Sequence, residues 1–192
     1  MRVVTLNHKD VEELCKGLLE DVRHSGFSPD IVLAVRTGGA EVGKIFFDLL
    51  RRTNSKNCTY LECDITRKST RKKRWLTKMA KALPLWLRNA LRIAEAKLSF
   101  GHKSRREFEK IGIPDELRHS AHSHILVIDD AVDSGATLQA VVNELKNVCP
   151  SATVRCAALT VTSDQPIFEP DFFSYHNQTL LRFPWSMDAT NQ

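Results

Sequence analysis

Short apolar runs alternate along the chain with segments in which apolar residues recur at helical spacing. Runs rich in β-branched residues predict buried strands at residues 31–35, 59–65, 125–128 and 154–161. Helical spacing predicts amphipathic helices at residues 8–24, 42–50 and 138–148. This alternation predicts an α/β fold with a doubly wound parallel sheet and flanking helices. Right-handed connections would then place the loops that follow Val35 and Ile128 along the same edge of the sheet.

Residues 125–137 read as a strand, a polar loop and the start of a helix, and this segment carries most of the chemistry. Asp129 and Asp130 are acceptor-only groups when ionised, so they suit the hydroxyls of a sugar or a divalent cation. Gly135 permits close approach of the backbone, and Ser134, Thr137 and the amides of the first helical turn can donate to a phosphate. Together these groups predict a site for a pentose 5-phosphate.

This segment resembles the signature of the type I phosphoribosyltransferases, which bind phosphoribosyl pyrophosphate (PRPP). The resemblance implies that Asp129 and Asp130 contact the ribose hydroxyls and that Mg²⁺ is the cofactor, with Asp130 as a metal ligand. It also implies that a loop wraps the 5-phosphate, made of Asp133, Ser134, Gly135, Ala136 and Thr137.

A second strand–loop–helix carries Arg36, Thr37, Gly38 and Gly39 in its loop. Adjacent glycines leave main-chain amides accessible, which suits a pyrophosphate. The loop is similar to the pyrophosphate loop of the 6-oxopurine members of the family, and the resemblance implies a cis peptide bond between Arg36 and Thr37. In those members a basic residue often stands directly before the glycine pair. Here Thr37 has that place and Arg36 comes one residue earlier, so we assign the main chain more firmly than the guanidinium.

Residues 180–187 can be interpreted as an amphipathic final strand capped by a proline. They also resemble the base-binding hood of xanthine, guanine and hypoxanthine phosphoribosyltransferases, which would place Leu180, Leu181 and Trp185 at the base. Two features depart from that subgroup: Leu180 stands where an aromatic residue usually stacks on the purine, and residues 160–164 lack the usual lysine. Asp133 matches the acidic residue near the purine imidazole, where it could accept a proton as catalytic base. A 6-oxopurine is favoured, and the base stays open.

Composition agrees with one cytoplasmic domain over residues 1–192. The chain has 192 residues, of which 42% are hydrophobic and 27% charged, enough to bury one core. We expect no signal peptide and no membrane-spanning segment. The five cysteines form no Cys-x-x-Cys pair, so we expect reduced thiols rather than disulfides or a zinc site.

A basic helical insertion is expected at about residues 67–122, and a small C-terminal hood at about residues 164–192. The insertion supplies much of the net charge of +5 and begins with a basic run at residues 67–74. We expect two helices that meet near Pro84, part of which could form a lid over the substrate. Such a segment suits a homo-oligomer interface, with a nucleic acid or another polyanion as the alternative partner; a membrane-surface role is remote.

Two functions follow. The first is a phosphoribosyltransferase that binds PRPP with Mg²⁺, transfers the phosphoribosyl group to a nitrogenous base and releases pyrophosphate. The second keeps the fold but senses PRPP or a nucleotide, as a regulator or as an effector subunit of a nucleic-acid-containing complex, for example a bacterial retron-type defence system.

Overall fold

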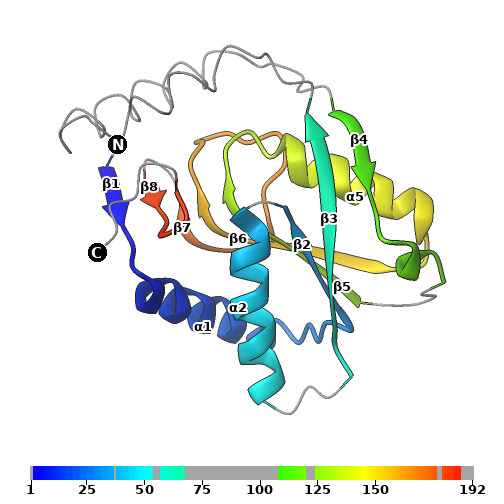
Figure 1. Cartoon of the computed structure of the whole chain (residues 1–192), viewed down its shortest axis with the longest axis horizontal. Coiled ribbons are helices and arrows are strands. Elements are labelled where there is room, and N and C mark those ends of the chain that lie inside the picture. The colour runs from blue at the N-terminus through cyan, green and yellow to red at the C-terminus, as the bar shows by residue number, and fades with distance from the viewer. Residues whose placement is uncertain are drawn as a thin grey trace.

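The computed structural model describes residues 2–36, 38–53, 57–67, 108–119, 124–176 and 179–186. Its main sheet has six strands in the order β4-β3-β2-β5-β6-β7 (Figure 1). The strands are β2 (Ile31–Val35), β3 (Thr59–Arg67), β4 (Phe108–Gly112), β5 (His124–Val132), β6 (Thr153–Val161) and β7 (Phe172–His176). All neighbours are parallel except β3 and β4, which are antiparallel.

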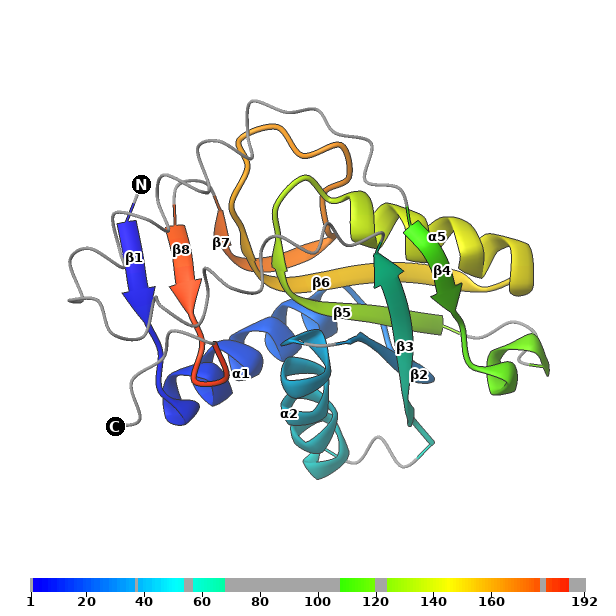
Figure 2. The same ribbon diagram turned by 45° about the horizontal axis from the view of Figure 1, so that its top comes forward.

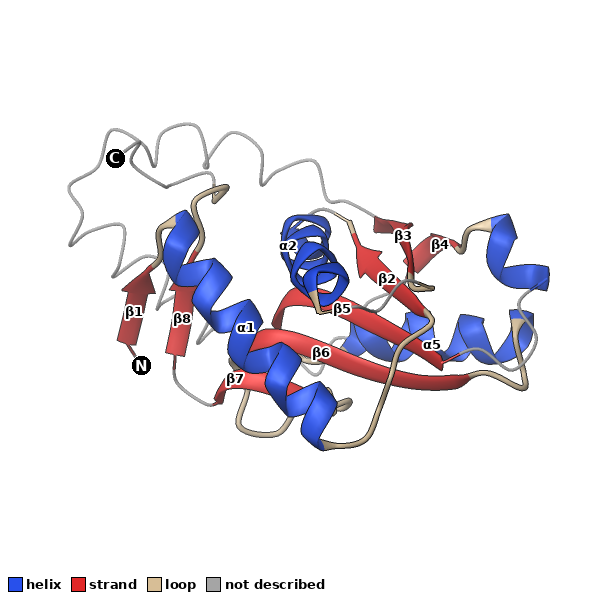
Figure 3. Ribbon diagram, turned by 90° about the horizontal axis from the view of Figure 1, so that it is seen from below, coloured by secondary structure: helices blue, strands red, loops and turns tan. Residues whose placement is uncertain are grey.

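Helices cover both faces of this sheet. Helices α1 (His8–His24) and α2 (Gly38–Arg52) lie on one face, and α5 (Ala136–Val148) lies on the other (Figure 3). Because side chains alternate along a strand, Leu126 of β5 is buried with α1 and α2, whereas the next residue, Val127, is buried with α5. A short 3₁₀ helix, η1 (Asp115–His119), follows β4.

The first and last described strands form a separate two-stranded sheet beside the main one (Figure 2). Strand β1 (Arg2–Thr5) is parallel to β8 (Thr179–Arg182), and the N–H of Leu6 donates to the carbonyl of Arg182 at 2.9 Å. The hydroxyl of Thr160 in β6 donates to the carbonyl of Thr179 at 3.0 Å. Strand β8 is therefore held between β1 and the main sheet.

Several sequence predictions are confirmed. The first helix has the predicted bounds, and its N-terminus is stabilised by a capping box in which Asn7 and Asp10 each accept a backbone N–H of the other. The predicted strands are all present, and β5 continues beyond its apolar run to Val132. Asp129 and Asp130 therefore lie within the strand, where successive side chains point in opposite directions.

The structure differs from the sequence prediction at the ends of two segments. The final part of the expected helical insertion contains β4 and η1, because pairing with β3 satisfies backbone groups that an open edge would leave exposed. The expected hood contains β7, which belongs to the main sheet. The two predicted helices near Pro84, the lid and residues 68–74 of the basic run lie outside the described residues. Among the helices described, none is long and apolar enough to span a bilayer.

Candidate functional site

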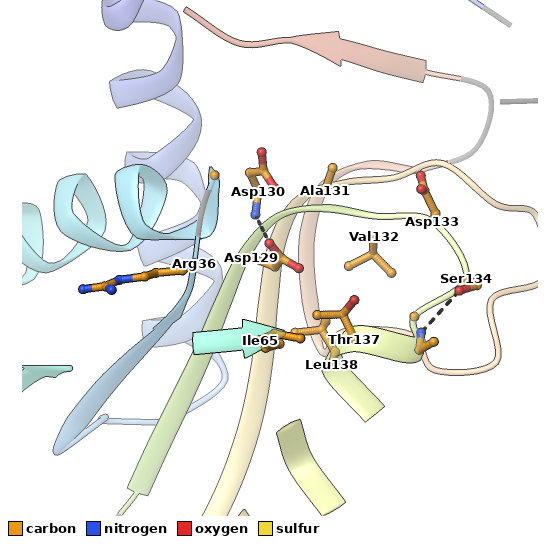
Figure 4. A pocket seen from close by; sticks show the side chains of 13 residues that line it. Arg36, Ile65, Asp129, Asp130, Ala131, Val132, Asp133, Ser134, Thr137 and Leu138 are labelled. Carbon is orange, nitrogen blue, oxygen red and sulfur yellow. Dashed lines mark hydrogen bonds between the residues drawn. The ribbon is translucent and has the colours of Figure 1, made fainter. Parts of the chain in front are cut away.

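A pocket of about 440 Å³ opens at the carboxyl ends of β2 and β5, where α5 begins (Figure 4). It brings together most of the ligand-binding residues predicted from the sequence: Arg36, Gly38, Asp129, Asp130, Asp133, Ser134, Gly135, Ala136 and Thr137. Parallel strands end at one edge of a sheet, so loops far apart in the sequence meet there. The loops that follow β2 and β5 thus meet at one edge of the sheet, and their roles in binding stay a prediction.

The acidic pair divides between two sides of β5. Asp129 is buried and points toward Thr137, whereas Asp130 points to the opposite side (Figure 4). One carboxylate oxygen of Asp129 accepts the backbone N–H of Asp130 at 2.9 Å. The carboxylate of Asp130 lies directly against Gly38 at the start of α2, so closely that any side chain at Gly38 would overlap it. Asp130 therefore faces the loop in which we predicted the pyrophosphate.

Burial raises the pKa of Asp130 above its usual range, and hydrogen-bond donors near its carboxylate act in the opposite direction. One of these donors is the indole N–H of Trp185. Nevertheless, the indole nitrogen is buried without a hydrogen-bond partner of normal geometry among the described residues. The N–H therefore lies close to the carboxylate without the alignment of a full hydrogen bond. Trp185 is in this way adjacent to the acidic pair.

The loop that opens α5 is built to leave backbone amides accessible. Gly135 is the N-cap residue, with a φ of 78°, and it has no side chain that could cap the helix. A side-chain bond at this end is long: Oγ of Ser134 accepts the backbone N–H of Ala136 at 3.4 Å (Figure 4). In most helices the side chain of the N-cap residue accepts one of the first backbone N–H groups. Gly135 has no such side chain, so the amides at this end are suited to an anion. The connection between β6 and β7 supports the loop from outside: the N–H of Ile167 donates to the carbonyl of Ser134 at 2.8 Å, and the backbone of Phe168 packs against Gly135.

Asp133 is the exposed carboxylate of the site. The hydroxyl of Thr162 donates to its Oδ1 at 2.8 Å, and the N–H of Thr162 donates to the carbonyl of Val132 at 2.9 Å. Both bonds come from the residue that follows β6. The end of β6 thus fixes the direction of Asp133 at the mouth of the pocket.

The glycine pair brings α2 into direct contact with β5. A Cβ on Gly39 would lie 2.8 Å from the carbonyl oxygen of Ile128 and 2.9 Å from the Cα of Asp129, which is closer than side chains approach. Gly39 therefore serves close packing and is buried behind the pocket. Thr37 and the predicted cis bond before it lie outside the described residues.

The guanidinium of Arg36 points away from both aspartates (Figure 4). Its Nε donates to Oε2 of Glu62 at 2.6 Å, and its Nη1 donates to Oδ1 of Asp64 at 3.1 Å. Both carboxylates are on β3, the neighbour of β2. These bonds hold the pKa of Glu62 below its usual range, mainly because the guanidinium of Arg36 stabilises the ionised form. Arg36 is therefore at the rim of the pocket with its charge already paired.

The residues predicted to contact a base are not gathered in the pocket. Leu180 and Leu181 are buried in packing contacts, with exposed fractions of 8% and 3%. Trp185 is half-buried and stacks on Phe183 with a ring separation of 5.0 Å and an interplanar angle of 6°. The contact of Trp185 with Asp130 is what connects this segment to the pocket.

Sequence reasoning missed four polar residues around the site. Tyr60, Glu62 and Asp64 alternate with apolar residues along β3 and contact the loop after β2, and Thr162 orients Asp133. The alternation on β3 was the available signal, since every second residue of the expected strand was polar. Thr162 had no comparable signal, because its role depends on a contact between β5 and β6.

In the described part of the chain, no three His, Cys, Asp or Glu side chains are grouped so that they could hold a metal ion. Mg²⁺ commonly uses one or two carboxylates together with phosphate oxygens and water. The separated carboxylates of Asp129 and Asp130 fit that limited protein contribution, in which a substrate supplies further oxygens.

Three comparisons with known proteins complete this picture. The chain resembles solved structures of a purine phosphoribosyltransferase from Pyrococcus horikoshii (18% identity, TM-score 0.64, 100% of this chain and 99% of that chain) and a xanthine-guanine-hypoxanthine phosphoribosyltransferase from Helicobacter pylori (17%, 0.65, 96% and 94%). It also resembles a hypothetical protein from Neisseria gonorrhoeae with bound ppGpp (16%, 0.66, 99% and 91%). At these identities the likeness concerns the fold.

A search of curated proteins gave no match. The model of the phosphoribosyl transferase domain matches residues 5–185, which include every strand and helix described here except the first residues of β1. The chain therefore belongs to the phosphoribosyl transferase domain family, whose enzymes transfer a phosphoribosyl group.

Proposed function

We propose that this protein binds PRPP with Mg²⁺ and transfers its phosphoribosyl group to a nitrogenous base, preferably a 6-oxopurine, with release of pyrophosphate. The proposal rests on one observation: the acidic pair of β5 and the glycine-capped start of α5 share a pocket with the loop after β2. These are the three kinds of group that a sugar carrying a phosphate and a pyrophosphate requires. We place the reaction in the cytoplasm and expect a homo-oligomer.

The ribose 5-phosphate would occupy the β5–α5 side. Asp129 is directed toward Thr137, so its carboxylate can accept hydrogen bonds from ribose hydroxyls. The amides of the first turn of α5, with Ser134 and Thr137, would donate to the 5-phosphate. This arrangement fixes C1 of the ribose relative to both other subsites, which lowers the entropic part of the barrier.

The pyrophosphate would lie beside Gly38 and Asp130. A carboxylate next to a pyrophosphate is repulsive unless a cation lies between them, so we assign Asp130 as a ligand of Mg²⁺. When bound, Mg²⁺ neutralises charge that develops on the departing pyrophosphate. Asp130 would hold the cation, and the amides at the start of α2, near Thr37, Gly38 and Gly39, would orient the phosphate oxygens.

The base would enter near Asp133 and the segment that contains Leu180, Leu181 and Trp185. A purine nitrogen attacks C1 and must lose a proton, which Asp133 would accept. The bond from Thr162 keeps this carboxylate in one direction, so it can meet the base without a search of rotamers. Leu180 and Leu181 project from opposite faces of β8 and are both buried, so they would hold the strand in place, and the ring of Trp185 would shape the subsite.

Turnover of PRPP with guanine, xanthine, hypoxanthine, adenine, uracil and orotate tests the proposal. We expect at least one 6-oxopurine to give nucleotide and pyrophosphate in the presence of Mg²⁺. Asp133→Asn should lower kcat by about 10²- to 10⁴-fold, because it removes the general base, while PRPP still binds. A wild-type protein that shows no heat of binding with PRPP and Mg²⁺, and no turnover of any base, refutes the proposal.

A second candidate function is that of a nucleotide-sensing regulator or an effector subunit of a nucleic-acid-containing complex, such as a retron-type system. The observation that favours it is the structural neighbour from Neisseria gonorrhoeae, which was crystallised with ppGpp. Guanosine tetraphosphate and PRPP both carry a ribose with phosphates on either side. Calorimetry that compares ppGpp, GMP and PRPP, with and without Mg²⁺, separates the two functions. Tight ppGpp binding without turnover would favour the regulator.

A further inference from the structure

Strand β3 carries three polar side chains on the face that meets the start of α2. Tyr60, Glu62 and Asp64 are spaced by two residues, so they project from the same face of the strand. Parallel pairing places Ala34 opposite Glu62 and Val35 opposite Cys63, so these side chains flank the end of β2. They therefore lie beside residues 36–40, the loop and first helical turn that we assigned to the pyrophosphate.

Two of these side chains form a continuous chain of hydrogen bonds. The hydroxyl of Tyr60 lies 3.0 Å from the carbonyl oxygen of Ala40 and 3.0 Å from Oε1 of Glu62. The other oxygen of Glu62 accepts the Nε of Arg36 at 2.6 Å. This series of hydrogen bonds therefore starts on the first residue of the loop, passes through β3 and ends on the first turn of α2.

The groups in this chain are mutually satisfied. The phenol has one proton and two acceptors, so the proton is shared between Ala40 and Glu62. Burial, followed by the bond to Glu62, raises the pKa of Tyr60, which keeps the phenol protonated at neutral pH. The backbone N–H of Arg36 also donates to the carbonyl of Cys63 at 3.0 Å, which fixes the main chain at the same place.

Resting on the proposed function, we infer that Tyr60 and Glu62 are positioning residues that clamp both ends of the pyrophosphate loop, and that Arg36 anchors this clamp and does not neutralise the pyrophosphate. The guanidinium of Arg36 is paired with two carboxylates, so its positive charge is offset before any anion binds. The side chain of Glu62 is 30% exposed and that of Asp64 is 67% exposed. Solvent screens the Asp64 pair more strongly, so Glu62 carries the clamp.

Conservative variants separate the clamp from a direct role of Arg36. Glu62→Gln and Tyr60→Phe each remove part of the chain, and the ring of Phe keeps the packing of Tyr60 against Phe47. Asp64→Asn is the matched control, because it removes only the more exposed partner of Arg36. We would measure the affinity for inorganic pyrophosphate with Mg²⁺ by calorimetry. Hydrogen exchange of the peptide that spans residues 36–43 would be measured without any ligand.

If the clamp operates, Glu62→Gln and Tyr60→Phe weaken pyrophosphate binding by about threefold to tenfold, the effect of losing one hydrogen bond. Both also speed exchange in the peptide, and Asp64→Asn changes affinity by less than about twofold. Arg36→Gln combined with Glu62→Gln should weaken binding no further than either substitution alone, because both break the same chain.

If Arg36 instead binds pyrophosphate directly, Glu62→Gln changes the affinity for pyrophosphate in the opposite direction. If Glu62 merely withholds a guanidinium that binds pyrophosphate, Glu62→Gln tightens binding and Arg36→Gln weakens it, which overturns the inference. Unchanged exchange in both Glu62→Gln and Tyr60→Phe overturns it as well. The exchange measurement needs no ligand, so the two proposals can fail separately. If the wild type binds neither PRPP nor pyrophosphate, but Glu62→Gln and Tyr60→Phe still exchange faster than the wild type, the proposed function is refuted and the clamp remains.

Discussion

At the scale of single residues, the site contains one carboxylate that the fold holds at a cost. Asp130 lies between Gly38 and Trp185, and burial raises its pKa. The folded state would be more stable with a neutral group at this position, since an ionised carboxylate loses hydration that its neighbours only partly replace. Active sites commonly keep such groups because binding requires the charge.

Asp130→Asn should therefore stabilise the protein in metal-free buffer at neutral pH while it weakens binding of PRPP. A pKa raised in the folded state means that the folded state retains this proton more strongly than the unfolded state. Below the unfolded-state pKa both states are protonated, and the wild type gains stability relative to higher pH. As pH rises through the raised pKa that contribution is lost. Thermal unfolding with EDTA should show the advantage of Asp130→Asn growing with pH and then becoming constant.

Asp48→Asn on the exposed side of α2 is the control for the general effect of removing a carboxylate. The comparison of the two variants shows which part of the pH course belongs to Asp130. An advantage of Asp130→Asn that is already complete at pH 4, or that declines as pH rises, would contradict the assignment of the raised pKa to Asp130.

At the scale of elements, the distance between α2 and the sheet is set by glycines. Gly43 lies over β2, where a Cβ would come within 2.6 Å of the Cβ of Ala34. Gly39 makes the corresponding close approach to β5. The helix can therefore rest on the backbone of two strands, which places its first turn beside the acidic pair.

A pair of glycine-to-alanine substitutions tests this packing. Gly43→Ala should destabilise the fold by about 1–3 kcal/mol, the usual cost of overpacking a tight interface. Gly17→Ala, at an exposed position of α1 with nothing within 4 Å, should stabilise it by about 0.5–1 kcal/mol through helix propensity. Chemical denaturation of both variants gives the two free energies of unfolding. Equal effects of the same sign would show that helix propensity, not contact with Ala34, governs position 43.

At the scale of the whole molecule, the two ends of the described chain support each other beside the site. Strand β8 has β1 as its strand partner, and Trp185 follows β8 by three residues. The fully buried side chain of Arg182 donates to the hydroxyl of Thr5 at 3.2 Å, which adds a polar tie between the strands. The segment that we assigned to the base thus depends on residues at the opposite end of the sequence.

Deletion of residues 1–5 should release β8 and leave the main sheet folded. Hydrogen exchange in residues 179–182 should accelerate by about tenfold or more, since these amides and carbonyls lose their ladder partners. Exchange in β5 should stay as slow as in the wild type, because its partners are β2 and β6. Leu6 and the cap residue Asn7 remain, so α1 keeps its N-terminus. Unchanged protection of β8 would show that its contacts with β6 and with Leu6 are enough to hold it.

Sequence patterns predicted most of the core of this fold, for identifiable physical reasons. Buried parallel strands such as β2 are continuous apolar runs, and α1 shows both a clear period and a capping box. Edge strands escaped prediction because their pattern is weak: β4 has the sequence Phe-Glu-Lys-Ile-Gly, and its identity as a strand comes from pairing with β3. Tertiary pairing, rather than local preference, decided those segments.

The candidate site likewise contains residues that local sequence patterns predicted and contacts that depend on tertiary pairing. The aspartates at the end of β5 and the small residues before α5 could be selected from the sequence because the chemistry of a phosphorylated sugar requires a compact local set of groups. The pairing of Arg36 with Glu62 was not, because it joins residues 26 positions apart through strand register. Leu180 and Leu181 were chosen by their place in a motif, and burial against the core then decided where their side chains point.

Contact between Gly38 and Asp130, and between Gly39 and the main chain of β5, yields a simple rule for comparing relatives of this protein. A chain with a larger residue at either position must hold α2 farther from β5, and its acidic pair will then face a wider gap. Alignments of such sequences can be sorted by these two columns alone. Those that keep both glycines should share the close contact of α2 with β5 and with the acidic pair, whatever their overall divergence.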